Sequence, residues 1–209
     1  MIVGIDLDNT IVKYDTSLYN LAVERGLVST GISKNKRVIR DAVRDLYGDE
    51  EWQKLQLAIY GDSIEDAELM PSVWSFLREL KKHGHTFMIV SHKTKYPNYG
   101  DTKVNLRSCA LRFLEKNNFF SENGLCMSRE DVFFLSTREE KVKMIKELNI
   151  DLFIDDLEEV FQDSHFPVGV KKVLFSFEKA ERRLPGAVVL SSFNEISEYV
   201  LERDGNGVS

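Results

Sequence analysis

The sequence predicts an α/β fold, in which a Rossmann-like three-layer core of parallel strands and helices receives a small inserted helical cap. Short apolar runs alternate with segments of helical period over most of the 209 residues. Strands that are apolar throughout are buried on both faces, and helices that connect such strands make right-handed crossovers in a parallel sheet. One long stretch after the first strand has helical period alone, which indicates an insertion.

The expected strands are the short apolar runs, at 2–5, 86–90, 132–135, 152–154, 173–177 and 188–190. The first run is mostly β-branched and stops at Asp6, shortly before the turn residues Asn9 and Thr10. That pattern is typical of a buried strand that leaves into a loop. The second run, TFMIV, likewise ends at a polar residue, Ser91.

The expected helices lie between these runs. In the helix before the second strand, Pro71 stands in the first turn, Gly84 follows the last turn, and the apolar residues of SVWSFLRELKK fall on one face. Further helices are expected at 103–117, 139–148 and 194–201, with a short one through Glu159. The alternation of helices and strands continues to the C-terminal region.

The expected domain organisation follows from this alternation. Residues 1–12 and 70–204 form the catalytic core, and the helical stretch 13–69 is a cap inserted over the edge at which the strands end. The tail GNGVS, residues 205–209, is expected to be disordered.

Composition excludes several classes of function. The net charge is −6, and no Lys/Arg cluster outweighs its acidic neighbours, which argues against binding of a nucleic-acid polymer. The N-terminal run MIVGI lacks a basic start and is cut short at Asp6, so it predicts neither a secretory signal nor a membrane span. We therefore expect a cytoplasmic protein whose Cys109 and Cys126, which lack CxxC spacing, are reduced packing residues.

Asp6 and Asp8 follow the first strand directly. Side chains alternate along an extended chain, so both carboxylates can project to the same side while Leu7 turns into the core. Two acids so close suit a division of labour, in which Asp6 attacks phosphorus and Asp8 protonates the departing alcohol. A turn or a helix cap would explain the pair taken alone.

Asp155 and Asp156 form a second acidic pair, again directly after an apolar strand. Ligands of open α/β sheets bind beyond the carboxyl ends of the strands, where both acidic pairs would converge. Carboxylates in such proximity repel unless a cation neutralises them, and a hard divalent ion such as Mg²⁺ prefers oxygen ligands. Alternatively, Asp156 caps the following short helix.

Residues after the second strand, and Lys141 further along the chain, could bind a phosphate. Ser91 and the backbone amides after it can hold phosphate oxygens at a strand end, and Lys93 or Lys95 could add charge there. His92 is a weaker candidate beside Ser91. A turn role explains Ser91 equally well, and a lone loop histidine is more often solvated. Lys141 lies near the start of the helix that precedes Asp155, from which its ammonium could reach the nucleophile and the phosphate, although its charged neighbours are typical of a solvated helix face.

Taken in chain order, IDLDNT, Ser91, Lys141 and the IDD of 154–156 resemble the motifs of the haloacid dehalogenase superfamily of hydrolases. The resemblance covers the whole chain. It implies that Asp6 is the nucleophile, that Asp8 is the general acid/base, and that Ser91 and Lys141 contact the phosphate. Because Asp8 is present, the resemblance is to the phosphatases and phosphomutases of this superfamily and not to its dehalogenases.

The resemblance also implies a metal and a cap. Magnesium would be held by Asp6, by the backbone carbonyl of Asp8 and by a final acid, with Asp156 favoured over Asp155. The insertion at 13–69 matches the position of the superfamily's first type of cap.

We therefore expect a Mg²⁺-dependent phosphomonoester hydrolase that acts on a small phosphorylated metabolite through an aspartyl-phosphate. The paired acids and the tyrosines at 96 and 99 favour a nucleotide monophosphate, with a sugar phosphate as the next candidate. A phosphomutase or phosphotransferase of the same superfamily is one alternative, and a catalytically silent binding or regulatory module is another. The sequence makes no prediction of the oligomeric state.

Overall fold

The computed structural model describes residues 1–97, 103–177 and 184–205. The chain divides into two compact units, which are described separately below. The first unit comprises Met1–Ile11, Leu69–Lys93 and Leu125–Ser209, and the second comprises Val12–Glu68 and Thr94–Gly124. Among the described residues, no helix is both long enough and apolar enough to cross a membrane.

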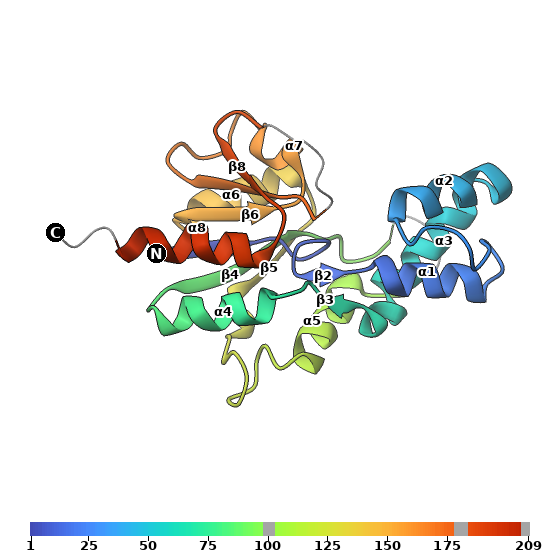
Figure 1. The fold of residues 1–209 in the computed structure, drawn as a ribbon, viewed down its shortest axis with the longest axis horizontal. Helices are drawn as coiled ribbons and strands as arrows, with labels where there is room; N and C mark the ends of the chain where they lie inside the picture. Colours follow the sequence, from blue (N-terminus) through green and yellow to red (C-terminus); the bar gives the residue numbers. More distant parts are fainter. Residues whose placement is uncertain (98–102, 178–183, 206–209) are drawn as a thin grey trace. The chain divides into compact units, whose positions relative to one another are not determined.

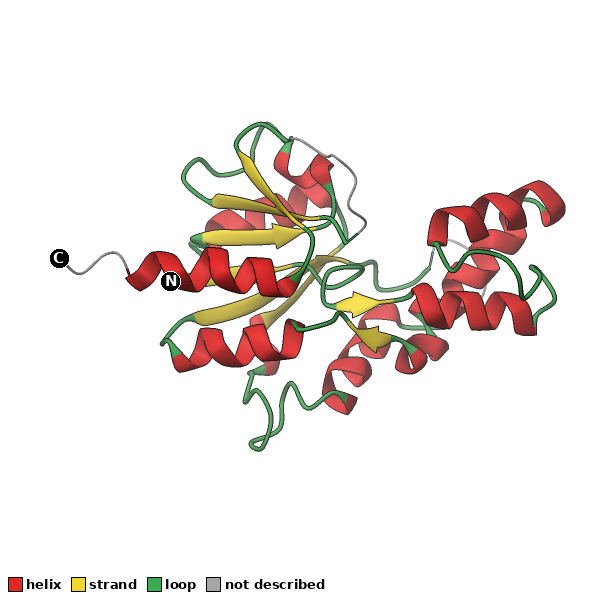
Figure 2. Cartoon of the chain, in the orientation of Figure 1, coloured by secondary structure: helices red, strands yellow, loops and turns green. Residues whose placement is uncertain are grey.

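The first unit is built on a six-stranded sheet in the order β5-β4-β1-β6-β7-β8, whose described pairings are all parallel (Figures 1 and 2). Its strands are β1 (Ile2–Ile5), β4 (Thr86–His92), β5 (Val132–Leu135), β6 (Leu152–Asp155), β7 (Lys171–Phe175) and β8 (Ala187–Leu190). All six were predicted from apolar runs, with ends that differ by up to two residues. The predicted α/β sheet is confirmed.

Helices cover both faces of this sheet. On one face, α4 (Val73–Lys82) packs against α8 (Phe193–Gly205), and the Phe193 ring stacks on Phe175 of β7 at a centroid distance of 5.2 Å. On the other face, Leu174, the neighbour of Phe175 in β7, belongs to a buried cluster with residues of α6 (Arg138–Glu147) and α7 (Glu158–Phe161). Because neighbouring side chains of a strand point to opposite faces, these helix pairs lie on opposite sides, which confirms the three-layer core.

The second unit is helical. It contains α1 (Asp15–Glu24), α2 (Lys36–Tyr47), α3 (Asp49–Tyr60), the 3-10 helix η1 (Asp62–Asp66) and α5 (Leu106–Lys116). Trp52, Leu55 and Ile59 form the buried face of α3. Two short strands that the sequence did not predict, β2 (Val12–Lys13) and β3 (Glu68–Leu69), pair with each other at the ends of the long helical segment.

Helix α5 differs from the sequence-based expectation in its location. The sequence predicts that all of 70–204 belongs to the core, whereas 94–124 groups with the helical insertion. The reason is that α5 packs on η1 and α3: Arg112 Nε lies 2.9 Å from Glu65 Oε1, and Lys116 Nζ donates to the Glu65 carbonyl at 2.6 Å. The predicted disordered tail, 205–209, falls outside the described residues except for Gly205, which ends α8.

Candidate active site

Three neighbouring strands of the first unit end at the same edge of the sheet. Strand β1 lies between β4 and β6, with Ile5 opposite both Ile89 and Ile154. The Asp6 amide donates to the Ile154 carbonyl at 2.9 Å, which extends the pairing by one residue beyond β1. Parallel pairing therefore brings the predicted residues of all three strand ends to one edge, as the carboxyl-end rule for α/β sheets predicts.

Asp6 and Asp155 share one buried lysine at this edge. Lys141 Nζ lies 2.6 Å from Asp6 Oδ1 and 2.7 Å from Asp155 Oδ2, and its side chain is 1% exposed. Lys143, two residues further along α6, is 75% exposed and pairs with Glu147 on the helix surface. The structure thus places Lys141, and not Lys143, beside the aspartates.

The first turn of α6 is fixed by a reciprocal cap. Thr137 Oγ1 accepts from the Glu140 amide at 3.1 Å, and the Glu140 carboxylate accepts from the Ser136 amide at 2.8 Å. This arrangement resembles a capping box, but the Glu140 carboxylate binds the amide of the residue before the N-cap Thr137 and not the amide of the N-cap itself. Lys141 follows directly, so the cap sets the direction from which its side chain enters the site.

The carboxylates of Asp6, Asp155 and Asp156 form a cluster suited to a cation. Each offers an oxygen, and these oxygens lie within 4.8 Å of one another. Asp155 already accepts from Lys141 with Oδ2 and from the Leu157 amide with Oδ1 at 3.0 Å. Both oxygens of Asp155 thus already accept hydrogen bonds within the protein. An all-oxygen, anionic donor set fits Mg²⁺.

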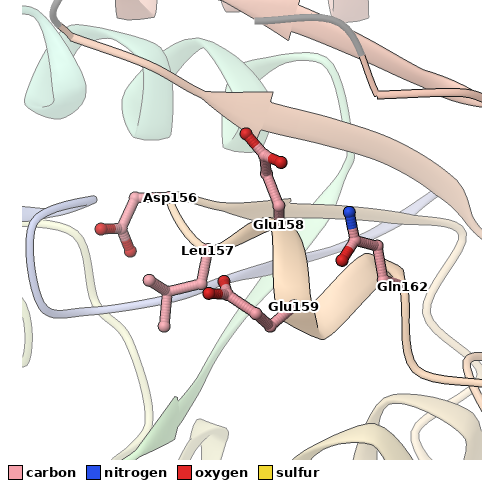
Figure 3. Close-up of a pocket in the computed structure, with 5 residues that line it drawn as sticks. All are labelled: Asp156, Leu157, Glu158, Glu159 and Gln162. Atoms are coloured by element: carbon pink, nitrogen blue, oxygen red, sulfur yellow. The ribbon is translucent and has the colours of Figure 1, made fainter.

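A pocket of about 310 Å³ opens beside this cluster at the start of α7. It is lined by Asp156, Leu157, Glu158, Glu159 and Gln162 (Figure 3). Three of these five side chains are carboxylates. Such a lining attracts cations and repels phosphate, so this side of the site favours the metal over the anionic substrate.

Burial and charge shift the protonation of the cluster. Burial raises the pKa of Asp6 to about 7, because the attraction of Lys141 does not fully offset burial together with the repulsion of Asp155 and Asp8. Burial by itself lowers the pKa of Lys141, but its attraction to Asp155 and Asp6 is stronger and raises that pKa above its usual range. Lys141 alone therefore does not keep Asp6 in its usual ionised form, and a further cation at the cluster would favour that form.

Ser91 presents a buried hydroxyl at the same edge. The residue is 1% exposed and pairs in register with Phe134 of β5. Its Oγ atom lacks a hydrogen-bond partner among the described residues. Because buried hydroxyls are normally hydrogen-bonded, this atom is suited to a ligand group such as a phosphate oxygen.

His92 differs from the sequence-based expectation, whereas Lys93 is one of the two lysines that were expected to add charge beside Ser91. The apolar run predicts a second strand that ends at residue 90, but β4 continues through His92. Alternation then turns His92 away from Ser91: its Nε2 lies 3.1 Å from the Ser136 carbonyl oxygen and the residue is exposed. Lys93 returns to the side of Ser91, where it is buried, with Nζ 2.8 Å from Asp8 Oδ2. The structure brings Lys93 into the site and does not bring His92 there.

Asp8 follows the buried Leu7 and is the most exposed of the candidate aspartates at the end of β1, with a side chain that is 22% exposed. Asn9 next to it has a φ of 59°, a left-handed turn conformation that asparagine tolerates. The chain turns there, since the Ile11 amide donates to the Leu7 carbonyl at 2.9 Å. This turn leaves Asp8 at the accessible end of the site. Of the two tyrosines considered for substrate contact, Tyr96 is exposed and Tyr99 lies outside the described residues.

Comparison with known proteins identifies the fold. No family model and no curated protein sequence matches the chain significantly. Solved structures do match over nearly the whole length. A hydrolase of the haloacid dehalogenase (HAD) family from Deinococcus radiodurans R1, with bound phosphate and sodium, gives a TM-score of 0.62 at 15% identity and covers 97% of this chain and 96% of that chain.

Two other similar structures have equally high coverage. A haloacid dehalogenase-like hydrolase from Streptococcus pneumoniae gives a TM-score of 0.59 at 14% identity, covering 95% of this chain and 97% of that one. A predicted phosphatase from Clostridium acetobutylicum gives 0.58 at 16% identity, covering 96% and 98%. The chain has the fold of the HAD-superfamily hydrolases, which confirms the fold that the sequence resemblance implied.

Proposed function

We propose that the protein is a Mg²⁺-dependent phosphomonoester hydrolase that acts on a small phosphorylated metabolite in the cytoplasm. The observation that supports this most directly is the buried Asp6–Lys141–Asp155 triad beside Asp156, at the carboxyl edge of the sheet. It combines a candidate nucleophile, a fixed cation and a cation-binding set of oxygens. The phosphate bound to the structurally similar D. radiodurans hydrolase is consistent with this chemistry.

In the first step, an Asp6 carboxylate oxygen attacks the phosphorus atom, and the bond from phosphorus to the ester oxygen breaks. Asp8, in its acid form, gives a proton to the leaving oxygen, so an alcohol departs and an aspartyl-phosphate remains on Asp6. In the second step, Asp8 removes a proton from water, and the water oxygen attacks phosphorus. The phosphorus–Asp6 bond then breaks, which releases phosphate and restores both aspartates.

The remaining residues stabilise charge. Lys141 orients Asp6 and neutralises part of the negative charge that gathers around the phosphoryl group. The Ser91 hydroxyl donates to a phosphate oxygen. Asp6, Asp156, Asp155 and the backbone carbonyl of Asp8 are the groups that would hold Mg²⁺, which would keep Asp6 ionised and screen the phosphoryl oxygens from the attacking carboxylate.

The experiment is a screen of the purified protein against nucleotide monophosphates, sugar phosphates and other small phosphoesters, with released phosphate as the readout. We expect turnover of at least one class, with nucleotide monophosphates first, and loss of turnover with a chelator that Mg²⁺ reverses. Transfer of phosphate to a second acceptor without release would favour a phosphomutase or phosphotransferase. Inactivity across the panel would overturn the proposal and favour a binding or regulatory module.

A further inference from the structure

Each of the two aspartates at the end of β1 has its own buried lysine. Lys141 contacts Asp6, and Lys93 contacts Asp8 with 2.8 Å between Nζ and Oδ2. The side chain of Lys93 is only 3% exposed. A buried ammonium is costly unless it is paired, so the position of Lys93 requires a functional or structural reason.

The backbone fixes where the Lys93 ammonium can reach. The Lys93 amide donates to the Leu135 carbonyl at 2.9 Å and so extends the pairing of β4 with β5 by one residue beyond His92. In that extended conformation, Lys93 lies on the same side of the strand as Ser91, whose buried hydroxyl is without a partner among the described residues. The lysine therefore enters the site from a rigid element.

We propose that Lys93 is a positioning residue that holds the carboxyl group of Asp8 in the orientation needed for proton transfer to the leaving group. This inference rests on the proposed phosphatase function. Asp8 follows the strand at the turn before Asn9 and its side chain is 22% exposed, whereas Lys93 is buried on the extended end of β4, so the contact joins the accessible carboxyl group to a rigid element. No bond to Lys93 changes in the reaction, and the proton is exchanged between Asp8 and the leaving oxygen alone. A small misplacement of a proton donor is enough to lower its efficiency greatly.

The role of Lys93 can be tested with two substrates whose leaving groups differ in their need for a proton. Nitrophenolate departs without protonation, whereas an alkoxide requires a general acid. The values of kcat/KM for p-nitrophenyl phosphate and for an alkyl phosphate report the transfer to Asp6, because that is the step in which the leaving group departs. For Lys93→Met, we expect kcat/KM to fall about 100-fold with the alkyl phosphate, within the range of general acid catalysis, and less than about fivefold with the nitrophenyl ester.

Three further variants complete the test. Lys93→Arg, which keeps the charge, should recover part of the alkyl phosphate activity. Lys82→Met, at a lysine whose side chain is 72% exposed, should leave both rates unchanged. In an Asp8→Asn background, Lys93→Met should lower kcat/KM for the alkyl phosphate little further, because a residue that acts through the Asp8 carboxyl group has no effect once that group is absent. This double variant also removes both charges of the pair, so it serves if Lys93→Met alone is too unstable to purify.

The outcomes separate the two proposals. Equal losses with both leaving groups, or a full additional loss in the Asp8→Asn background, would overturn the role of Lys93 and indicate phosphate binding or a purely structural role. If Asp8→Asn discriminates between the leaving groups while Lys93→Met does not, the phosphatase proposal stands and this inference fails. The phosphatase proposal itself fails if the wild-type protein, with Mg²⁺ present, is inactive across the whole phosphoester panel, and the role of Lys93 then fails with it.

Discussion

Lys141 Nζ and Asp6 Oδ1 lie 2.6 Å apart, although 135 residues separate them in the chain. The contact depends on two independent features: the pairing of β1 with β6 that continues through the Asp6 amide, and the capped first turn of α6 that precedes Lys141. Both belong to the three-layer core. The site is therefore a consequence of strand order and helix capping, and predictions about it concern stability as well as catalysis.

Asp6→Asn should abolish turnover without weakening the fold. An amide cannot form the aspartyl-phosphate, so kcat should fall by a factor on the order of 10³ or more. Burial and the neighbouring carboxylates make the ionised form of Asp6 unfavourable in the metal-free protein. The metal-free variant should therefore be at least as stable as the wild type at about pH 8, as measured by urea denaturation. Normal turnover by this variant would exclude Asp6 as the nucleophile.

Lys141→Met should destabilise the protein strongly, unlike the matched change Lys143→Met. Removal of Lys141 leaves Asp6 and Asp155 buried without their cation, and loss of one partner from a buried pair costs about 3–5 kcal/mol. Lys143 is exposed and its loss should change the free energy of unfolding by less than about 0.5 kcal/mol. Equal effects in chemical denaturation at neutral pH would contradict the buried triad.

Mg²⁺ binding should release a proton from Asp6. The pKa of Asp6 rises in the folded state from 3.8 to about 7, so between these values the folded metal-free protein holds a proton that the unfolded chain has lost. The protonated Asp6 therefore contributes most to the stability of the metal-free protein at about pH 4 and below, and this contribution is lost as the pH rises through about 7. A metal needs the ionised carboxylate, so its affinity should weaken about tenfold per pH unit below pH 7.

Titration calorimetry at about pH 6 measures this release. The apparent heat of Mg²⁺ binding should differ between two buffers that have different enthalpies of protonation. The difference should correspond to the release of nearly one proton for each Mg²⁺ ion bound. Asp6→Asn provides the control, since an amide has no proton to release. Identical heats in both buffers would contradict the shifted pKa of Asp6.

Ser91→Ala should weaken substrate binding while leaving stability unchanged. The Ser91 hydroxyl is buried without a partner among the described residues, so its removal breaks no hydrogen bond of the protein itself. A lost hydrogen bond to a charged phosphate should raise KM or the inhibition constant of inorganic phosphate about tenfold. Ser91→Thr retains the hydroxyl and should keep most of the affinity. A loss of stability with unchanged phosphate inhibition would show that Ser91 has a packing role only.

The sequence was informative where an apolar run ends at a residue that can take part in catalysis. The apolar runs predicted each strand of the core sheet, and Asp6, Ser91, Lys141 and Asp155 were predicted from their positions at or before strand ends. Helix α5 was placed in the wrong unit because its periodicity shows that it has a buried face but not which surface covers that face. Only the tertiary contacts with η1 and α3 decide this.

His92 shows a second kind of failure, and Lys93 was predicted only as one of two lysines that could add charge beside Ser91. Because the expected strand stopped at residue 90, its alternation was not continued into SHK, and His92 was weighed as a neighbour of the phosphate. Side chains at i and i+2 of a strand lie on the same side, so a strand continued to residue 93 would have placed Lys93, and not His92, on the side of Ser91. A lysine at a strand end is normally solvated, so its burial against Asp8 could be recognised only in the structure.

The central claim is that Asp6 becomes phosphorylated during turnover. The most direct measurement mixes the protein with Mg²⁺ and a substrate from the phosphoester screen, quenches the reaction with acid in the first turnovers, and locates the phosphate by peptide mass spectrometry. The account predicts a phosphate on Asp6, in the peptide that contains IDLDNT, that forms and decays at rates compatible with kcat. Sustained phosphate release with no phosphorylated Asp6 at any time, and with an Asp6→Asn variant that still turns over, would contradict it.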